Sequence, residues 1–194
     1  VSGSANTAFA QLRLTNLLEP RIGGNPFRTD LPDNRNEVYD RLDLEGDFGD
    51  VGLGLRFETY HQGFESAAEP GYDEITQRWA DWSNAGVRVR VGNFYTILGR
   101  GLLHRSFELP GVVLDQTLFP SRYTPSRDVD GVLAEAAAGP LAARVFQGRP
   151  STGEFAPSAE EVSPDFGRRG IVSGAQATID VWRGSQLGAA YTRL

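Results

Sequence analysis

Charged residues alternate with apolar residues in several short segments of this sequence. Arg88 and Arg90 alternate with valines in VRVRV, and Arg56 and Glu58 keep the same spacing in LRFE. In an extended chain, side chains two residues apart lie on the same face, so each segment predicts one charged face and one apolar face. The charged face has to meet water or residues of opposite charge, and we therefore expect a mixed-charge ladder across neighbouring strands. The residues with this spacing are Arg41, Asp43, Glu45, Arg56, Glu58, Arg88 and Arg90.

A loop rich in glycine and arginine follows the last of these segments. Gly99 and Gly101 flank Arg100 in LGRGLLHRSFE, so the backbone can turn sharply while it presents a guanidinium group. The irregular region runs from about Thr96 to Arg127. A structureless region of this length is usually functional or mobile. We expect any selectivity of the protein to lie in this loop.

Other residues that could carry out chemistry give weaker signals. His104 and Ser106 are two residues apart, which is no specific spacing for a catalytic dyad, and the chain has only 2 histidines. The glycines of GRG and GLGL lack the βαβ context of a dinucleotide site. Asp30, Asp33 and Glu37 do not match the spacing of an EF-hand, so we interpret them as solvated turn residues. The sequence predicts no enzyme, no cofactor and no metal site.

The overall composition limits the possible partners. The chain has 194 residues, a formal net charge of -6 and no cysteine. The negative charge argues against nucleic acid as a partner, and the lack of cysteine excludes disulfides and thiolate metal sites. No apolar run approaches the roughly 18 to 20 residues of a membrane helix. This leaves a β-barrel, whose lipid-facing signal is spread over every second residue.

Alternating segments of about ten residues recur along the whole chain and predict about nine strands. The first predicted strand ends at Asn16, before an irregular stretch that begins LLEPRIGG. The segment from Ile75 to Trp82 mixes polar and aromatic residues on both sides, so its facing stays ambiguous. The predicted strands cover residues 7–16, 38–47, 51–61, 75–82, 128–138, 141–149, 170–182 and 186–194, together with a strand that begins at Val87.

Long loops and short turns alternate between these segments, so the short turns would lie at one end of the sheet. This asymmetry is typical of outer-membrane barrels, and a ten-residue strand tilted by about 45° matches the hydrocarbon thickness. Charges in series on the polar rows favour the same interpretation. So do the aromatic residues toward the predicted strand ends, namely Tyr39, Phe57, Tyr60, Trp82, Trp182 and Tyr191.

We therefore predict an all-β, antiparallel, up-and-down transmembrane β-barrel, with residues 1–194 forming a single barrel domain or a barrel fragment. A soluble lipocalin-like barrel or a β-sandwich would give the same alternation and is the alternative. The odd strand count favours a fragment, because single-chain bacterial barrels have an even number of strands. The ending GAAYTRL also lacks the final Phe or Trp that closing strands of such barrels commonly carry.

The segment GNFYTILGRGLLHRSFELPGVVLDQTLFP resembles a family of porin-like outer-membrane barrels of unassigned function from Gram-negative bacteria. In that family a strand ending in Gly-Asn/Asp-Phe-Tyr leads to a Phe/Leu-Gly-Arg-Gly-Leu loop and a later Leu-x-x-Asp segment. The resemblance covers about the middle third of the chain and implies a location and a fold, not a substrate. The matching residues are Gly92, Asn93, Phe94, Tyr95, Leu98, Gly99, Arg100, Gly101, Leu102 and Asp115.

In such a barrel, the seven ladder residues, together with Arg13, Arg144 and Asp180, would line a wet lumen and set the field felt by a solute. The loop after Tyr95 could fold inward and narrow the pore, and its candidate constriction or plug residues are Arg100, Arg105, Glu108 and Asp115. The alternatives are an outer face whose charges are merely solvated, and a loop that lies over the rim with its arginines paired to acidic neighbours.

The expected function is porin-like passage of solutes through the bacterial outer membrane, or a structural role in that membrane. The expected partners are the lipid bilayer and other outer-membrane or envelope proteins. The alternative function is that of a soluble or surface-displayed β protein that binds a partner through its long loops.

Overall fold

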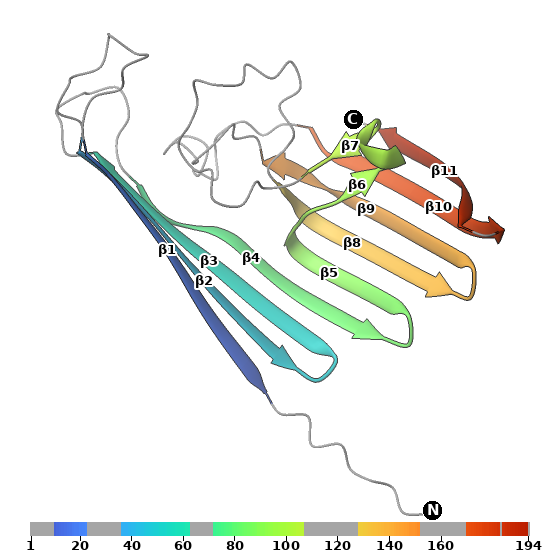
Figure 1. Ribbon diagram of the computed structural model, residues 1–194, viewed down its shortest axis with the longest axis horizontal. Helices are drawn as coiled ribbons and strands as arrows, with labels where there is room; N and C mark the ends of the chain where they lie inside the picture. Colours follow the sequence, from blue (N-terminus) through green and yellow to red (C-terminus); the bar gives the residue numbers. More distant parts are fainter. Residues whose placement is uncertain are drawn as a thin grey trace, which may run out of the picture.

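The computed structural model describes residues 10–22, 36–62, 72–106, 128–151, 170–182 and 184–193, and it confirms the predicted all-β, antiparallel fold. Nine strands form one sheet, in the order β1-β2-β3-β4-β5-β8-β9-β10-β11 (Figure 1). Each strand pairs with the strands next to it in this order. The sheet consists of β1 (Gln11–Ile22), β2 (Asn36–Phe48), β3 (Val51–Gln62), β4 (Tyr72–Asn84), β5 (Val87–Phe94), β8 (Asp128–Ala138), β9 (Leu141–Ser151), β10 (Val172–Trp182) and β11 (Ser185–Arg193).

A small hairpin interrupts this meander between β5 and β8. It consists of β6 (Ile97–Leu98), the single 3-10 turn η1 (Gly99–Gly101) and β7 (His104–Arg105). The two short strands pair with each other and not with the large sheet. In the part of the chain that the structure describes, no helix is long and apolar enough to cross a membrane.

The connections have unequal lengths at the two ends of the sheet, as the sequence predicts. Residues 49–50, 85–86 and 139–140 form two-residue turns at one end, where β10 is also followed closely by β11, and every longer connection joins strands at the other end (Figure 1). Ala85 and Gly86 both have positive φ angles, of 47° and 80°. This is the geometry of a type I′ turn, whose twist matches that of the paired strands and so sets their register.

The strand register separates the sheet into two chemically different faces. Cross-strand partners share a face, and Leu14 lies opposite Leu44, which in turn lies opposite Leu55. On the other face, Asp43 lies opposite Arg56. Because side chains alternate strictly along a strand, this register carries one apolar row and one charged row from strand to strand.

The first strand is longer than predicted. Residues 17–22 belong to β1 and not to a loop, and Pro20 lies within the strand opposite Val38. Proline has no N–H to donate, which excludes it from a central strand but not from an edge strand. β1 is an edge of the sheet, so Pro20 does not interrupt the pairing with β2.

The ambiguous facing of the segment from Ile75 to Trp82 has a structural cause. Phe57 pairs with Ile75 and Arg56 pairs with Gln77, so Thr76 is an extra residue in β4. Such a bulge reverses the alternation on its two sides. Ile75 therefore lies on the apolar face and Gln77 on the charged face, although both positions are odd-numbered.

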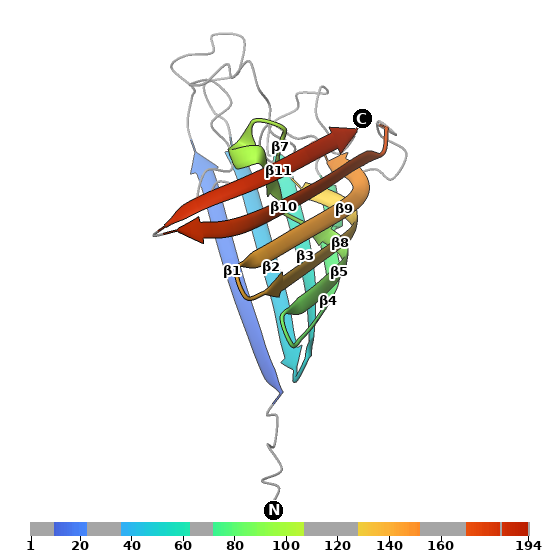
Figure 2. The same cartoon turned by 90° about the vertical axis from the view of Figure 1, so that its right-hand side faces the viewer.

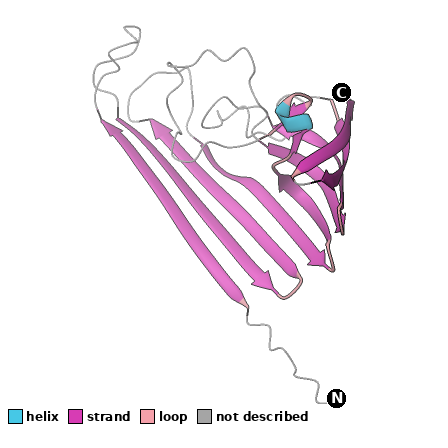
Figure 3. Ribbon diagram, turned by 45° about the vertical axis from the view of Figure 1, so that its right-hand side comes forward, coloured by secondary structure: helices cyan, strands magenta, loops and turns pink. Residues whose placement is uncertain are grey.

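The sheet curls, and the small hairpin lies on its concave side. In Figure 2 the hairpin lies between β10 and β11 in front and the first strands behind, and Figure 3 shows the last strands turning back toward it. Leu98 of the hairpin joins a buried cluster with residues of the charged face. The charged face is therefore the concave one and the apolar face the convex one. Within the described residues the sheet does not close, because β1 and β11 are both edges.

Two of the aromatic residues near strand ends differ from the expectation for a membrane barrel. Tyr39 and Tyr60 lie opposite each other on the concave face and are buried. The ring of Tyr60 also lies 5.9 Å from that of Tyr72. These tyrosines pack among themselves because their positions in the register point inward, so they do not belong to an outward-facing aromatic belt.

Candidate functional site

The concave face carries a series of ion pairs that begins at the first strand. Arg13 pairs with Glu45 across β1 and β2. The guanidinium of Arg56 donates to Asp43 at 2.6 Å across β2 and β3, and the Nε atom of Arg41 lies 3.1 Å from the same carboxylate. Arg56 also lies 3.8 Å from Glu58, which is buried.

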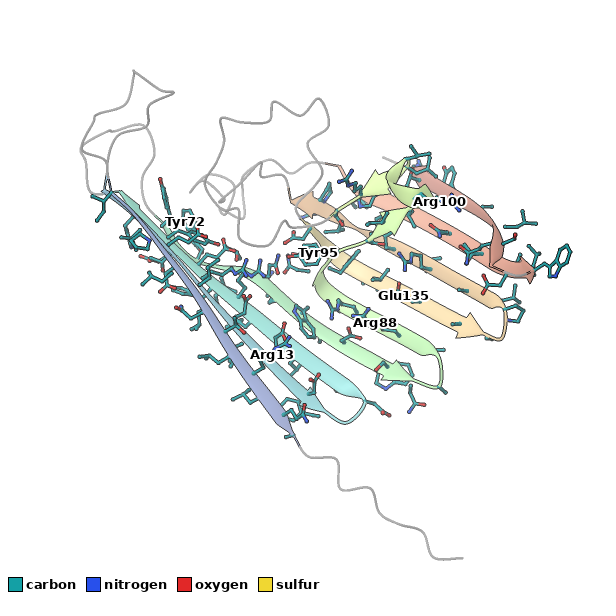
Figure 4. All side chains as sticks on the ribbon, in the orientation of Figure 1. Arg13, Tyr72, Arg88, Tyr95, Arg100 and Glu135 are labelled. Atoms are coloured by element: carbon teal, nitrogen blue, oxygen red, sulfur yellow. The ribbon has the colours of Figure 1, made fainter. Side chains whose placement is uncertain are left out.

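A second series of ion pairs begins at Asp81 of β4. Arg88 and Arg90 of β5 both donate to this carboxylate, with nitrogen to oxygen distances of 2.5 and 2.7 Å. Arg88 then lies 3.3 Å from Glu135 of β8, and Arg144 of β9 lies 2.8 Å from the same glutamate. Figure 4 shows Arg88 and Glu135 on neighbouring strands of this face. The result is an ion-pair ladder, defined here by the residues named in this and the preceding paragraph.

A guanidinium of the ladder also packs against an aromatic ring. The charged carbon of Arg90 lies 4.0 Å from the centroid of the Trp79 ring. Such a cation–π contact contributes about 0.5 to 2 kcal/mol depending on desolvation. This contact holds the Arg90 side chain flat against the sheet, where its guanidinium contacts both Trp79 and Asp81.

The backbone of the hairpin turns through three consecutive left-handed residues. Gly99, Arg100 and Gly101 have φ angles of 58°, 57° and 86°. Glycine adopts this conformation readily, whereas a residue with a Cβ atom does so at a cost. The N–H of Leu102 closes the turn on the carbonyl of Gly99 at 3.2 Å. The sequence prediction of a sharp turn at GRG matches this geometry.

The hairpin is fastened to the concave face by a buried side chain. Leu98 is 0% exposed and packs in a cluster with Phe94, Val129, Leu133, Phe146 and Val172. Gly174 of β10 makes this packing possible, because a Cβ atom at that position would lie 2.5 Å from Leu98 and would also overlap the ring of Phe146. The missing side chain of Gly174 thus forms the hole into which Leu98 fits.

Two polar contacts hold the same hairpin on either side of Leu98. Arg144 of the ladder donates to the carbonyl of Ile97 at 3.1 Å, and the N–H of Gly99 donates to the side-chain oxygen of Gln176 at 3.1 Å. Both contacts reach backbone groups, so they constrain the path of the hairpin itself. They also connect it directly to the ladder through Arg144.

His104 and Ser106 have structural contacts in the hairpin. The hydroxyl of Ser106 accepts a hydrogen bond from the N–H of Thr96 at 2.8 Å and donates to its carbonyl at 3.2 Å. The His104 ring lies 4.9 Å from the ring of Phe146, and burial lowers the pKa of this histidine below its ordinary value. This arrangement supplies no histidine base to the Ser106 hydroxyl.

The structure brings together some of the predicted site residues and separates others. Arg100 of η1 and Arg105 of β7 are both exposed residues of the hairpin, and Figure 4 labels Arg100 there. Glu108 and Asp115 lie outside the described residues, as do Asp30 and Asp33. All seven residues of the predicted lumen-lining set lie on the concave face in the ladder, where their role in a lumen stays a prediction: Arg41, Asp43, Glu45, Arg56, Glu58, Arg88 and Arg90.

Sequence reasoning missed several residues that connect the ladder to the hairpin. Asp81 was hidden by the ambiguous facing of β4, and Glu135 lies in an alanine-rich segment with weak alternation. Gln176 and Gly174 both lie in β10, and nothing in the sequence of that strand indicates that they contact the hairpin. Within the described residues, no group of acidic, histidine or cysteine side chains is arranged to hold a metal ion.

Comparison of the chain with known protein families and with curated proteins finds no match.

Proposed function

We propose that this chain forms part of the wall of a membrane-spanning antiparallel β-barrel in the bacterial outer membrane and permits porin-like passage of solutes. In this proposal the convex face contacts lipid and the concave face lines a water-filled lumen. The hairpin formed by β6, η1 and β7 narrows that lumen. The proposal also draws on the resemblance of the segment Gly92–Leu102 to porin-like barrels of Gram-negative bacteria, which implies this location and fold.

The observation that carries the proposal is the uncovered apolar convex face. Large apolar side chains continue across the sheet from β1 to β11, and all of them are exposed: Leu12, Leu14, Leu18, Ile22, Val38, Val51, Leu53, Leu55, Phe57, Ile75, Trp82, Val87, Val91, Val132, Leu141, Val145, Ile179, Leu187 and Tyr191. Nine strands spaced by roughly 4.8 Å give the face a width of about 38 Å. With a height of about 25 Å, which is the apolar band of outer-membrane barrels, the face covers on the order of 1,000 Å². Soluble monomers rarely expose apolar patches beyond about 600 Å².

The height of this face fits a lipid bilayer. The apolar row of β1 runs from Leu12 to Ile22, about 33 Å along the strand at roughly 3.3 Å per residue. At a tilt of about 45° this corresponds to about 23 Å, close to the roughly 25 Å apolar band of outer-membrane barrels. Asn16 interrupts this row with a polar side chain, which donates a hydrogen bond to Asp40 of β2 at 2.5 Å.

The edges of the apolar face have the composition expected of membrane interfaces. At the short-turn end, Phe48, Trp82 and Trp182 are exposed on the convex side, and Trp182 reaches it because a register shift places it opposite Ser185. Aromatic side chains of this kind are typical at the lipid headgroups. Toward the long-connection end of β4 to β11, the convex positions become polar: Arg78, Asp130, Gln147, Arg149, Ser173 and Arg193.

The concave face supports the second half of the proposal. Its charges are paired in two groups, one across β1, β2 and β3 and one across β4, β5, β8 and β9. Cross-strand pairs of this kind stabilise a wall that is wet on one side. The hairpin formed by β6, η1 and β7 packs against this face through Leu98. A segment fastened inside the curl reduces the free cross-section of any lumen that the sheet surrounds.

Strand direction constrains how the barrel closes. Because the nine strands are antiparallel throughout, the two edge strands β1 and β11 run in the same direction. An all-antiparallel closure therefore places an odd number of further strands between them. Direct pairing of β1 with β11 would create one parallel junction.

Detergent dependence tests the membrane half of the proposal. We expect the purified chain to be monodisperse only in micelles, since the convex face has to be covered. A monodisperse chain in plain buffer would contradict the proposal and favour the soluble β protein.

Conductance in planar bilayers tests the passage of solutes. Correct insertion is first established by heat-modifiable mobility on gels, and we then expect discrete current steps. Inserted protein without conductance would refute the passage and leave a structural role in the membrane.

A further inference from the structure

We propose that Arg100 is a binding site for an anionic group, carboxylate or phosphate, on the solute that passes the hairpin. This inference rests on the proposed function and adds the chemical class of the solute. It is carried by three observations on the concave side: the pairing of the other arginines, the charge of the hairpin, and the backbone at Arg100.

The arginines of the ladder are all neutralised by carboxylates. Arg13, Arg56, Arg88, Arg90 and Arg144 each lie within 4.0 Å of an acidic oxygen. Arg100 differs, because it forms no ion pair with any residue that the structure describes. Its guanidinium is exposed, and its planar set of N–H donors has the geometry that binds a carboxylate or phosphate in a bidentate way.

The hairpin itself contains no negative charge. Its sequence from Tyr95 to Ser106 is YTILGRGLLHRS, with two arginines and no aspartate or glutamate. On the sheet beside the hairpin, Arg144 and Glu135 form an ion pair, so this pair adds no net charge. The chain as a whole has a net charge of -6, so any attraction for anions has to be local.

The backbone at this position favours glycine, yet the residue is arginine. Arg100 has φ 57° and ψ 29° between two glycines. Strained conformations of this kind persist where the surrounding structure enforces them, and they cluster at ligand-binding and active sites. The packing of Leu98 and the hydrogen bonds at Ile97 and Gly99 hold the turn in place, so the Arg100 side chain starts from a fixed backbone position.

The first test measures the local field without requiring conduction. The chain has no cysteine, so Leu102→Cys creates a single thiol on a side chain that is 90% exposed and two residues from Arg100. The reaction rates of this thiol with anionic sulfonatoethyl and cationic trimethylammonioethyl methanethiosulfonate are compared in micelles. We expect Arg100→Gln to lower the anionic-to-cationic rate ratio about threefold, the effect of one charge at roughly 8 Å in about 0.1 M salt.

The controls separate the positive charge at position 100 from charge elsewhere on the chain. Arg100→Lys should retain most of the rate ratio, and Arg149→Gln on the convex side should leave it unchanged. Inorganic phosphate or tartrate, added in turn, should slow the anionic reagent in the parent chain but not in the Arg100→Gln variant. Inhibition by phosphate assigns a phosphate group to the solute, and inhibition by tartrate assigns a carboxylate. An unchanged ratio in Arg100→Gln, or no inhibition by either anion, would overturn the site.

The second test links the site to passage. In planar bilayers with a KCl gradient, the reversal potential gives the permeability ratio of chloride to potassium. We expect this ratio to fall about threefold in Arg100→Gln and to be retained in Arg100→Lys. A conducting pore with the same ratio in all three chains contradicts the inference alone. A correctly inserted protein that does not conduct contradicts the proposed passage, and the thiol experiment then decides the anion site by itself.

Discussion

Arg100 combines an exposed charge with a backbone conformation that costs free energy. The left-handed region disfavours any residue with a Cβ atom by about 1 to 2 kcal/mol. The glycines on both sides accept the same conformation without this cost. At the scale of single residues, the clearest expectation is therefore a conflict between stability and charge at this position.

Replacing Arg100 by glycine should stabilise the protein. We expect Arg100→Gly to raise the free energy of unfolding in micelles by about 1 kcal/mol, because the strain disappears. Leu102→Gly is the matched control, since Leu102 is exposed and has an ordinary φ of -79°. There glycine should cost about 0.5 to 1 kcal/mol. Equal effects of the two substitutions, measured by urea unfolding, would argue against strain at Arg100.

His104 should make the docking of the hairpin sensitive to acid. Burial lowers its pKa below the ordinary value of 6.5, and its Nε2 atom is buried with no hydrogen-bond partner among the described residues. Below about pH 6.5 the unfolded chain therefore binds a proton that the folded chain does not. Stability is fully present above that pH and falls as the pH drops toward the lower folded pKa.

A titration of stability checks this expectation. His104→Phe keeps an aromatic ring beside Phe146 and removes the ionisable group, so it should flatten the loss of stability between pH 6.5 and more acidic values. His61→Gln, at an exposed histidine, should leave the His104 contribution in place. The same slope in His104→Phe and in the parent chain would show that this histidine does not contribute.

The hairpin is the element that turns a curved wall into a candidate constriction. Its two strands have two residues each and could not hold a position alone. Its place depends on Leu98 entering the hole at Gly174 and on hydrogen bonds from Arg144 and to Gln176. Docking is thus a property of tertiary contacts and can be removed without breaking the sheet.

Filling the hole at Gly174 should release the hairpin. We expect Gly174→Val to displace Leu98, to increase the mobility of a spin label on Leu102→Cys, and to raise single-channel conductance where the pore conducts. The energetic scale is that of an overpacked core, about 1 to 3 kcal/mol. Gly170→Val is the control, because a Cβ atom there meets nothing within 4 Å. A label whose mobility is the same in Gly174→Val and in the parent chain would contradict the packing of Leu98 against Gly174.

At the scale of the whole molecule, the decisive feature is the difference between the two faces of one sheet. Leu14 and Thr15 are neighbours in β1, but Leu14 belongs to the apolar convex face and Thr15 lies opposite Asp43 on the concave face. Both residues are exposed in the chain by itself. Lipid on one side and water on the other would make them respond differently to the same substitution.

An arginine scan at these two positions tests the orientation. In lipid, Leu14→Arg should cost about 2 to 4 kcal/mol near the middle of the bilayer, whereas Thr15→Arg should be tolerated beside Asp43. Folding yield into lipid vesicles and stability in urea provide the measurements. If both variants fold equally well, the convex face does not contact lipid. This result would favour the alternative of a soluble β protein.

The sequence by itself determined the strands, their approximate number, the unequal ends and the assignment of charges to one face. These properties are local: alternation with period two and the chemistry of two-residue turns act over a few residues. It also singled out the GRG turn, because glycine on both sides of an arginine has a direct backbone meaning. Local pattern failed at Leu17–Ile22, where an edge strand accepts Pro20, and at Thr76, where a bulge reverses the alternation.

Only the tertiary structure decided which distant residues meet. The link from Arg88 to Glu135, the hydrogen bonds that join Arg144 to Ile97 and Gly99 to Gln176, and the hole at Gly174 depend on strand register and on the curl of the sheet. Register couples positions that are tens of residues apart, and the curl brings the hairpin onto the concave side (Figure 2). No periodicity within one segment contains that information, because each contact is set by the sum of every strand pairing between its partners.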